Sequence, residues 1–242
     1  MKWKFVVALN LCCVPFVWAQ SVSDSELIAR IKLNRGNFQE WDRGPNLPEK
    51  AKLLGKDILA SPTVRETPIL CDRCPKPDPE NHPEVKRAAS ESDLVAIGHV
   101  VRNISASTQN EAFVFTDSEF VVDEVLKSND ASPTSRVIGV GDEVTVTAPG
   151  GSVKSGSFRI TASPSNRVPL QVGHRYLLFL AFLPNSRSYV QTSLFGFDIT
   201  KPTVLSLRTT LISPASELFS DRSLFLHAMR SSTHLAVDET SK

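Results

Sequence analysis

The feature that most constrains the fold is a succession of strand-like segments within residues 91–200. Leu94–Val101 is rich in β-branched residues, and Val144–Thr147 alternates valine with threonine. Both patterns favour strands, whereas the nearly continuous apolar run Arg175–Leu183 favours a strand buried on both faces. Turn signals separate the segments, and no helical pattern comes between them. Because closure removes exposed strand edges, we expect a mainly β fold with a small OB-like antiparallel β-barrel over residues 91–200.

The segment before the barrel, residues 20–60, predicts a helical arm. Ser23 and Glu26 have the spacing of a capping box, and Gly36 is placed to end that helix in a left-handed conformation. A second helix is indicated by Asn46 as N-cap and Pro48 in the first turn. Two large aromatic residues between the helices are expected to anchor the arm: Phe38 and Trp41.

Residues 61–90 contain six prolines, which disfavour helix interiors and ladder hydrogen bonds. We therefore expect an extended, proline-rich linker between arm and barrel. Residues 201–242 are expected to form a C-terminal helix and tail, with Ser216 as a possible N-cap. The apolar residues of that amphipathic helix are Leu218, Phe219, Leu226 and Met229.

The first 19 residues resemble a signal peptide. Lys2 and Lys4 precede an apolar stretch, and Val17–Ala19 approximates the small-x-small pattern before a cleavage site. The stretch is shorter than the ~20 residues of a spanning helix, so an uncleaved anchor is disfavoured. A lipoprotein is also disfavoured, because leucine rather than a small residue precedes Cys12. We expect a secreted or periplasmic protein with no stable membrane span after cleavage.

Composition narrows the classes of partner. The apolar content of 41% is enough to build a core, and the formal net charge is +1. Nucleic-acid-binding modules usually show a basic face and a high pI, so we expect no nucleic-acid partner.

Cleavage after Ala19 would leave Cys71 and Cys74 as the only cysteines of the mature chain. In an oxidising compartment such a pair usually forms a bridge, and we expect a Cys71–Cys74 disulfide. A zinc site would need further ligands, and His82 is the only histidine close in sequence. A redox centre would need a helix after the first cysteine, which the following prolines disfavour.

Several other residues could in principle bind a ligand or act in catalysis, but a structural function is expected for each of them. Gly150 and Gly151 fit a turn or bulge, since the Gly-x-x-x-x-Gly-Lys pattern of a P-loop is missing. His99 falls in a strand pattern and His174 in a turn, where histidines are more often structural than catalytic. We expect no catalytic residue, metal or cofactor. Four carboxylates follow one strand and are expected on a solvated face: Asp117, Glu119, Asp123 and Glu124.

The segments SDLVAIGHVV, VVDEVLKS, VTVTAPGG and GHRYLLFL resemble a pattern in uncharacterised secreted bacterial proteins. That pattern is similar to the OB-like barrel of tissue inhibitors of metalloproteinases and netrin modules. The resemblance covers about residues 90–200 and implies the barrel fold. It transfers no functional residue, because those inhibitors use a Cys-x-Cys at the mature N-terminus and this chain has Cys-x-x-Cys at Cys71.

These observations predict an exported, non-catalytic binding or interaction module, in the bacterial envelope or outside the cell, for an unknown protein or envelope ligand. Two alternatives remain open from the sequence: a protease-inhibitor-like protein, and a thiol or metal protein that uses Cys71 and Cys74.

Overall fold

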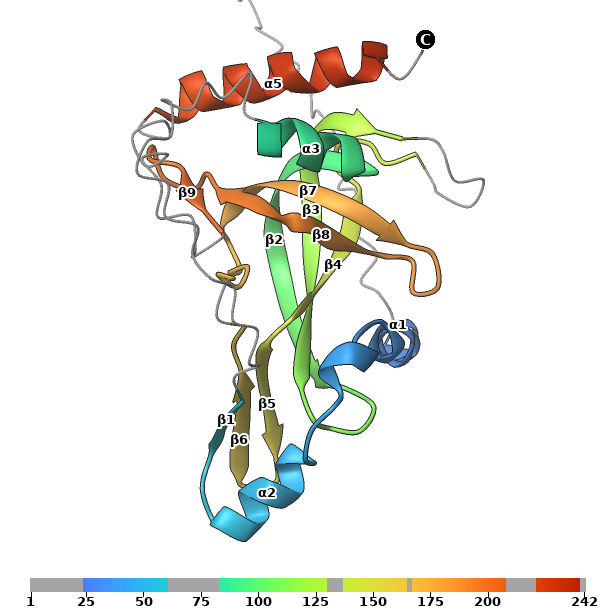
Figure 1. The fold of residues 1–242 in the computed structure, drawn as a ribbon, viewed down its shortest axis with the longest axis vertical. Coiled ribbons are helices and arrows are strands. Elements are labelled where there is room, and N and C mark those ends of the chain that lie inside the picture. The colour runs from blue at the N-terminus through green and yellow to red at the C-terminus, as the bar shows by residue number, and fades with distance from the viewer. Residues whose placement is uncertain (1–23, 61–82, 130–136, 165–166, 208–220, 240–242) are drawn as a thin grey trace, which may run out of the picture.

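The computed structural model describes residues 24–60, 83–129, 137–164, 167–207 and 221–239. Five strands form a ring, a three-stranded sheet lies at one end of it, and helices flank both (Figure 1). The predicted mainly β fold, a small barrel with flanking helices, is confirmed. No helix in these ranges is both long enough and apolar enough to cross a membrane.

The barrel has the strand order of an OB fold. Neighbouring strands pair in antiparallel fashion in the order β4-β3-β2-β7-β8, and a parallel pairing between β4 and β8 closes the ring. Numbered along the chain, the five strands follow one another as third-second-first-fourth-fifth, and the ring closes between the third and the fifth. A short strand, β9 (Leu205–Ser206), pairs with β8. The barrel strands are β2 (Leu94–Ser107), β3 (Val114–Ser128), β4 (Glu143–Pro149), β7 (Arg175–Leu183) and β8 (Ser188–Asp198).

Strand β7 is buried on both faces, as its apolar run predicts. Tyr176, Leu178 and Leu180 point into the barrel core, whereas Leu177 and Phe179 belong to a second core on the outside. Helices α3 (Pro83–Glu91) and α5 (Arg222–Glu239) cover that outer core (Figure 1). Burial of these side chains removes apolar surface from water on both sides of one strand.

One expectation about the flanking segments needs correction. Residues 83–90, expected to be extended, lie in helix α3, which begins at Pro83; proline is tolerated in a first helical turn because its missing N–H has no intrahelical partner. Helix α5 begins at Arg222, and Asp221 accepts from the backbone N–H groups of Ser223 and Leu224. Ser216, expected as N-cap, lies outside the described residues, as do residues 1–23.

A smaller sheet lies at the opposite end of the barrel from α5 (Figure 1). Its order is β1-β6-β5, with β1 parallel and β5 antiparallel to β6. Helix α2 (Leu47–Leu54) packs on it through Leu47, which shares a core cluster with Phe113 and Ile160. The strands are β1 (Ile58–Ala60), β5 (Gly151–Ser155) and β6 (Phe158–Ala162).

The N-terminal arm consists of α1 (Asp24–Asn37), a 3₁₀ turn η1 (Gln39–Trp41) and α2. Asn46 caps α2 as predicted, since its side chain accepts from the backbone N–H of Glu49 at 2.9 Å. The expected end of α1 at Gly36 is wrong: Gly36 lies inside the helix and has no positive φ.

The predicted aromatic anchors are confirmed, and they explain where α1 ends. Phe38 stacks on Phe115 with ring centroids 5.0 Å apart, and Trp41 lies 5.2 Å from Phe113. These contacts fix the chain just beyond Asn37, so tertiary packing rather than the glycine ends the helix.

Candidate functional site

Strand β3 separates two polar sites, because alternate residues of a strand point to opposite faces. Asp117 and Glu119 point outward, toward helix α1. Thr116 and Ser118 point inward and line a cavity in the mouth of the barrel.

Helix α1 lies across the outer face of the barrel, between two of its loops. OB barrels commonly bind ligands on the face of their second and third strands, here β3 and β4, and in the loops at its two ends. Those loops are residues 108–113, between β2 and β3, and residues 184–187, between β7 and β8. Arg35 reaches the first region by donating to the carbonyl of Ser107 at 3.1 Å, and Asn37 reaches the second by donating to Ser186 Oγ at 3.0 Å. The chain's own arm therefore occupies this face.

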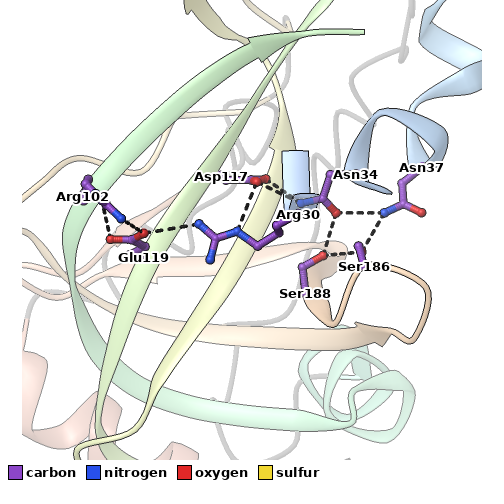
Figure 2. A network of polar contacts seen from close by, with 8 residues as sticks. All are labelled: Arg30, Asn34, Asn37, Arg102, Asp117, Glu119, Ser186 and Ser188. Atoms are coloured by element: carbon purple, nitrogen blue, oxygen red, sulfur yellow. Dashed lines mark hydrogen bonds and ion pairs between the residues drawn. The ribbon is translucent and has the colours of Figure 1, made fainter. Parts of the chain in front are cut away.

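Asn34 is the centre of the polar network that holds α1 (Figure 2). Its Nδ2 donates to both carboxylate oxygens of Asp117, at 3.0 and 2.9 Å, and both residues are fully buried. Its Oδ1 accepts from Ser188 Oγ at 2.9 Å and from Asn37 Nδ2 at 3.1 Å. Both ends of the amide are thus satisfied by protein groups.

Arg30, one helical turn before Asn34, connects the two buried carboxylates. Its Nη2 donates to Glu119 Oε1 at 3.3 Å, and its Nε lies 3.7 Å from Asp117 Oδ2. Glu119 also binds Arg102, its cross-strand partner on β2, which donates to both carboxylate oxygens, with Nε 2.6 Å from Oε2. Glu119 therefore lies between one guanidinium from the barrel and one from the arm.

The two carboxylates differ in protonation behaviour. Burial raises the pKa of Asp117 above its ordinary value, and the hydrogen bonds and the charge of Arg30 offset this only in part. Burial also raises the pKa of Glu119, but the hydrogen bonds and charges of Arg102 and Arg30 outweigh it and bring the pKa below its ordinary value. Glu119 is thus the more firmly ionised member of the pair.

The arm is also fastened beyond α1. Asp42 accepts from Thr108 Oγ1 and from the backbone N–H groups of Asn110, at 2.6 Å, and Ala112, at 3.3 Å. The backbone N–H of Leu47 donates to the carbonyl of Glu111 in the same loop at 3.0 Å. Asp42 thus accepts from three donors of the loop, and it both orders the loop and holds η1 on it.

The inner site is a cavity of about 360 Å³ in the mouth of the barrel. Two cross-strand pairs of β2 and β3 line it: Ser105 with Thr116, and Asn103 with Ser118. Asn103 donates to the carbonyl of Leu170 at 2.7 Å, which fixes the amide at the wall. Mouths of β-barrels are frequent places for small-molecule sites.

Gly150 and Gly151 form another wall of the cavity and allow close approach of the backbone. A Cβ on Gly151 would lie 2.2 Å from Thr116 Oγ1, and the φ of Gly151 is 132°. Only glycine is compatible with both conditions. The pair joins β4 to β5, so the interpretation as a turn or bulge agrees with the structure. It lines the cavity.

Gln191 on β8 completes the cavity lining. The residue is 8% exposed, and within the described part of the chain its Nε2 is buried without a hydrogen-bond partner. Buried polar groups nearly always have partners, so such a group calls for a specific explanation.

The two histidines lie away from both sites. His99 Nδ1 is 3.0 Å from Asp123, which also accepts from Arg175 at 2.9 Å. His174 Nδ1 is 2.8 Å from Asp198. In each pair the carboxylate fixes the orientation of a partly exposed ring.

The prediction that four carboxylates lie on a solvated face is wrong for two of them, Asp117 and Glu119. Asp123 and Glu124 are partly exposed and paired with arginines, Glu124 with Arg230 of α5 through two hydrogen bonds. Asp117 and Glu119 are buried, because α1 covers this part of β3. The signal that was missed is the polar face of the arm, since Arg30, Asn34 and Asn37 recur at helical spacing.

The cysteine pair, Cys71 and Cys74, lies outside the described residues, as does His82. Within the described ranges, no three histidine, cysteine, aspartate or glutamate side chains are grouped so as to hold a metal ion. Comparisons with known proteins found no matching family model and no significantly similar curated protein.

Proposed function

We propose that the protein is an exported, non-catalytic binding module that holds a small, uncharged ligand in the mouth of its OB barrel. The observation that carries this proposal is the cavity between β2, β3 and the Gly150–Gly151 junction. The outer face of β3 and β4, where OB barrels commonly bind, is occupied by α1. The cavity offers a separate site on the inner side of the same strand.

The lining defines the class of ligand. Side-chain hydroxyl and amide groups alternate with alanine, proline, valine and leucine, and Arg167 is the only charged residue among them. Such a surface matches a compact molecule with an apolar body and a few hydrogen-bonding groups. The buried Nε2 of Gln191 favours a ligand, or a ligand-bound water, with an acceptor such as an amide carbonyl. Among the described residues, the lining offers no carboxylate for a metal ion or a cationic ligand.

The non-catalytic part of the proposal rests on the placement of the titratable groups. His99 and His174 are engaged by Asp123 and Asp198 and do not line the cavity. In the described part of the chain, the cavity lining therefore has hydroxyl and amide groups and no histidine or carboxylate base. Such a site supports recognition better than proton transfer or nucleophilic attack.

Ligand binding is tested with a panel of neutral and charged probes of similar size. N-acetylglucosamine, which has an amide carbonyl and a methyl group, is compared with glucosamine and glucuronate by ligand-observed NMR. We expect the neutral amide to bind and the charged sugars not to bind. Ala148→Phe, which fills the cavity, should abolish binding, whereas the exposed Val137→Phe should not. Equal binding to wild type and the Ala148 variant, or preference for a charged probe, would refute the cavity assignment.

Export and the disulfide are tested by intact mass of the purified mature protein. We expect a chain that starts at Gln20 and thiols that react with an alkylating agent only after reduction. A retained N-terminus would refute export through a cleaved signal, and free thiols at Cys71 and Cys74 would refute the bridge.

A further inference from the structure

The outer face of β3 and β4 has more negative than positive side chains when only the barrel is considered. Asp117, Glu119 and the exposed Glu143 interact with one another, and Arg102 is the barrel guanidinium among them. Burial and the neighbouring charge of Glu119 raise the pKa of Glu143. Arg30 of the arm supplies the additional positive charge at this face.

Helix α1 contacts this face mainly through polar groups. Its Arg30 and Asn34 bind the carboxylates. Of its apolar side chains, Ile28 and Leu33 are 66% and 50% exposed, and Leu27 and Ile31 are only partly buried. The aromatic stacking and the anchoring by Asp42 begin only after the helix ends. Release of α1 would break this polar network, whereas the later part of the arm would keep its aromatic stacking and the hydrogen bonds of Asp42.

We propose that the outer face of β3 and β4 is a docking surface for a helical segment of a partner protein, and that α1 is its built-in competitor. The partner segment would present arginine and asparagine one helical turn apart, as Arg30 and Asn34 do. Charge complementarity supports this chemistry, because the arginine would meet Glu119 and Asp117 and the amide would meet the buried Asp117. This inference is independent of the cavity, which lies on the other side of β3.

The tether gives α1 an advantage that a partner must overcome. A segment joined to its own binding face has an effective concentration of order millimolar, so a free peptide with the same contacts competes poorly. Weakening the resident helix should therefore reveal the surface.

The probe is a fluorescein-labelled peptide of residues 24–42, whose binding is measured by fluorescence anisotropy. The protein is the full mature chain, either wild type or with Arg30→Ala and Asn34→Ala combined. We expect the double variant to bind the peptide at least tenfold more tightly than wild type. A peptide with the same two alanines should bind at least tenfold more weakly than the native peptide.

The control protein is Ile28→Ala, which alters the exposed side of α1 and should behave like wild type. Circular dichroism and thermal unfolding establish that the double variant is folded. Equal binding of native and alanine peptides to a folded double variant would overturn the proposal, because recognition would not use Arg30 or Asn34.

A second measurement needs no variant. In hydrogen exchange of the wild-type protein, we expect α1 amides to exchange faster than those of β3 and to exchange faster still with excess unlabelled peptide. Protection of α1 equal to that of β3, unchanged by peptide, would overturn the proposal. A wild-type dimer that exchanges α1 between copies would also overturn the partner assignment, because the face would then belong to a second copy.

Discussion

Asn34 donates to both carboxylate oxygens of Asp117, at 3.0 and 2.9 Å, across a sequence separation of 83 residues. The pair joins the N-terminal helix to the second barrel strand at a point from which water is excluded. Because α1 covers the face on which OB barrels usually bind, this contact helps to keep that face covered.

Asp117→Asn should raise the free energy of unfolding at pH 7. The pKa of Asp117 is raised in the folded protein, so the folded state binds its proton more tightly than the unfolded state does. Stability from this group is therefore highest below the unfolded pKa, taken as the ordinary 3.8, and falls as pH rises through the folded pKa. Asparagine keeps the carbonyl acceptor for Asn34 and removes the buried charge.

Urea denaturation of wild type and the Asp117→Asn variant between pH 3 and pH 8 checks the direction of this stability difference and its dependence on pH. The advantage of the variant should shrink as pH falls toward 3. A variant less stable than wild type at pH 7 would show that the attraction between Asp117 and Arg30 exceeds the burial penalty.

Gln191→Leu should stabilise the protein and weaken ligand binding. Leucine replaces a buried amide whose Nε2 has no partner in the described part of the chain, and removing such a group is worth about 1 kcal/mol. Thermal unfolding and NMR titration with N-acetylglucosamine measure the two effects. The exposed Gln171→Leu is the matched control, because Gln171 contacts Tyr176 through its backbone. A clear loss of stability in Gln191→Leu would assign Gln191 a structural function.

Asp42→Ala should lower the free energy of unfolding by about 2 kcal/mol, because it removes a charged acceptor shared by the Thr108 hydroxyl and the backbone N–H groups of Asn110 and Ala112. Asp42→Asn retains one acceptor oxygen and should lose less. Chemical denaturation ranks the three proteins. Equal stability of the alanine and asparagine variants would contradict this order.

Gly98→Ala should be strongly destabilising. The added Cβ would lie 2.1 Å from the carbonyl oxygen of Val121 and 2.7 Å from the Phe120 ring, so the backbone of β3 would have to move. Overpacking of this kind costs about 1–3 kcal/mol or more.

Gly36→Ala in α1 is the opposite case, because nothing lies within 4 Å of its added Cβ. It should stabilise the helix by up to about 1 kcal/mol. Thermal unfolding of Gly98→Ala and Gly36→Ala tests both predictions, and similar melting temperatures for the two variants would contradict them.

The barrel was predictable from sequence because its strands have local signals. The apolar run Arg175–Leu183 predicted a strand buried on both faces, and Asn46 with Pro48 predicted the start of a helix. Pro83 was misleading, because proline density indicates a break in structure and does not show on which side of the proline a helix begins.

The outer site was not predictable from the same signals. Asp117 and Glu119 resemble any exposed carboxylates of a strand, and their burial depends on a helix that lies more than 80 residues away in sequence. The polar spacing of Arg30 and Asn34 was visible, but its partner was not. The prediction that α1 ends at Gly36 was wrong for a related reason, since the stacking of Phe38 on Phe115 decides where the helix ends.

Helix α1 is synthesised before the barrel residues that it contacts, so it cannot dock until they have been made. Asn34 precedes its partner Ser188 by 154 residues, and Asn37 precedes Ser186 by 149. At about 5–20 residues per second, the helix is made roughly 8–30 s before these partners exist. An isolated helix of this length is marginal in water, so the newborn segment remains without its final structure through most of chain elongation. During that interval chaperones or neighbouring nascent chains have access to it, and the last barrel strand determines when that access ends.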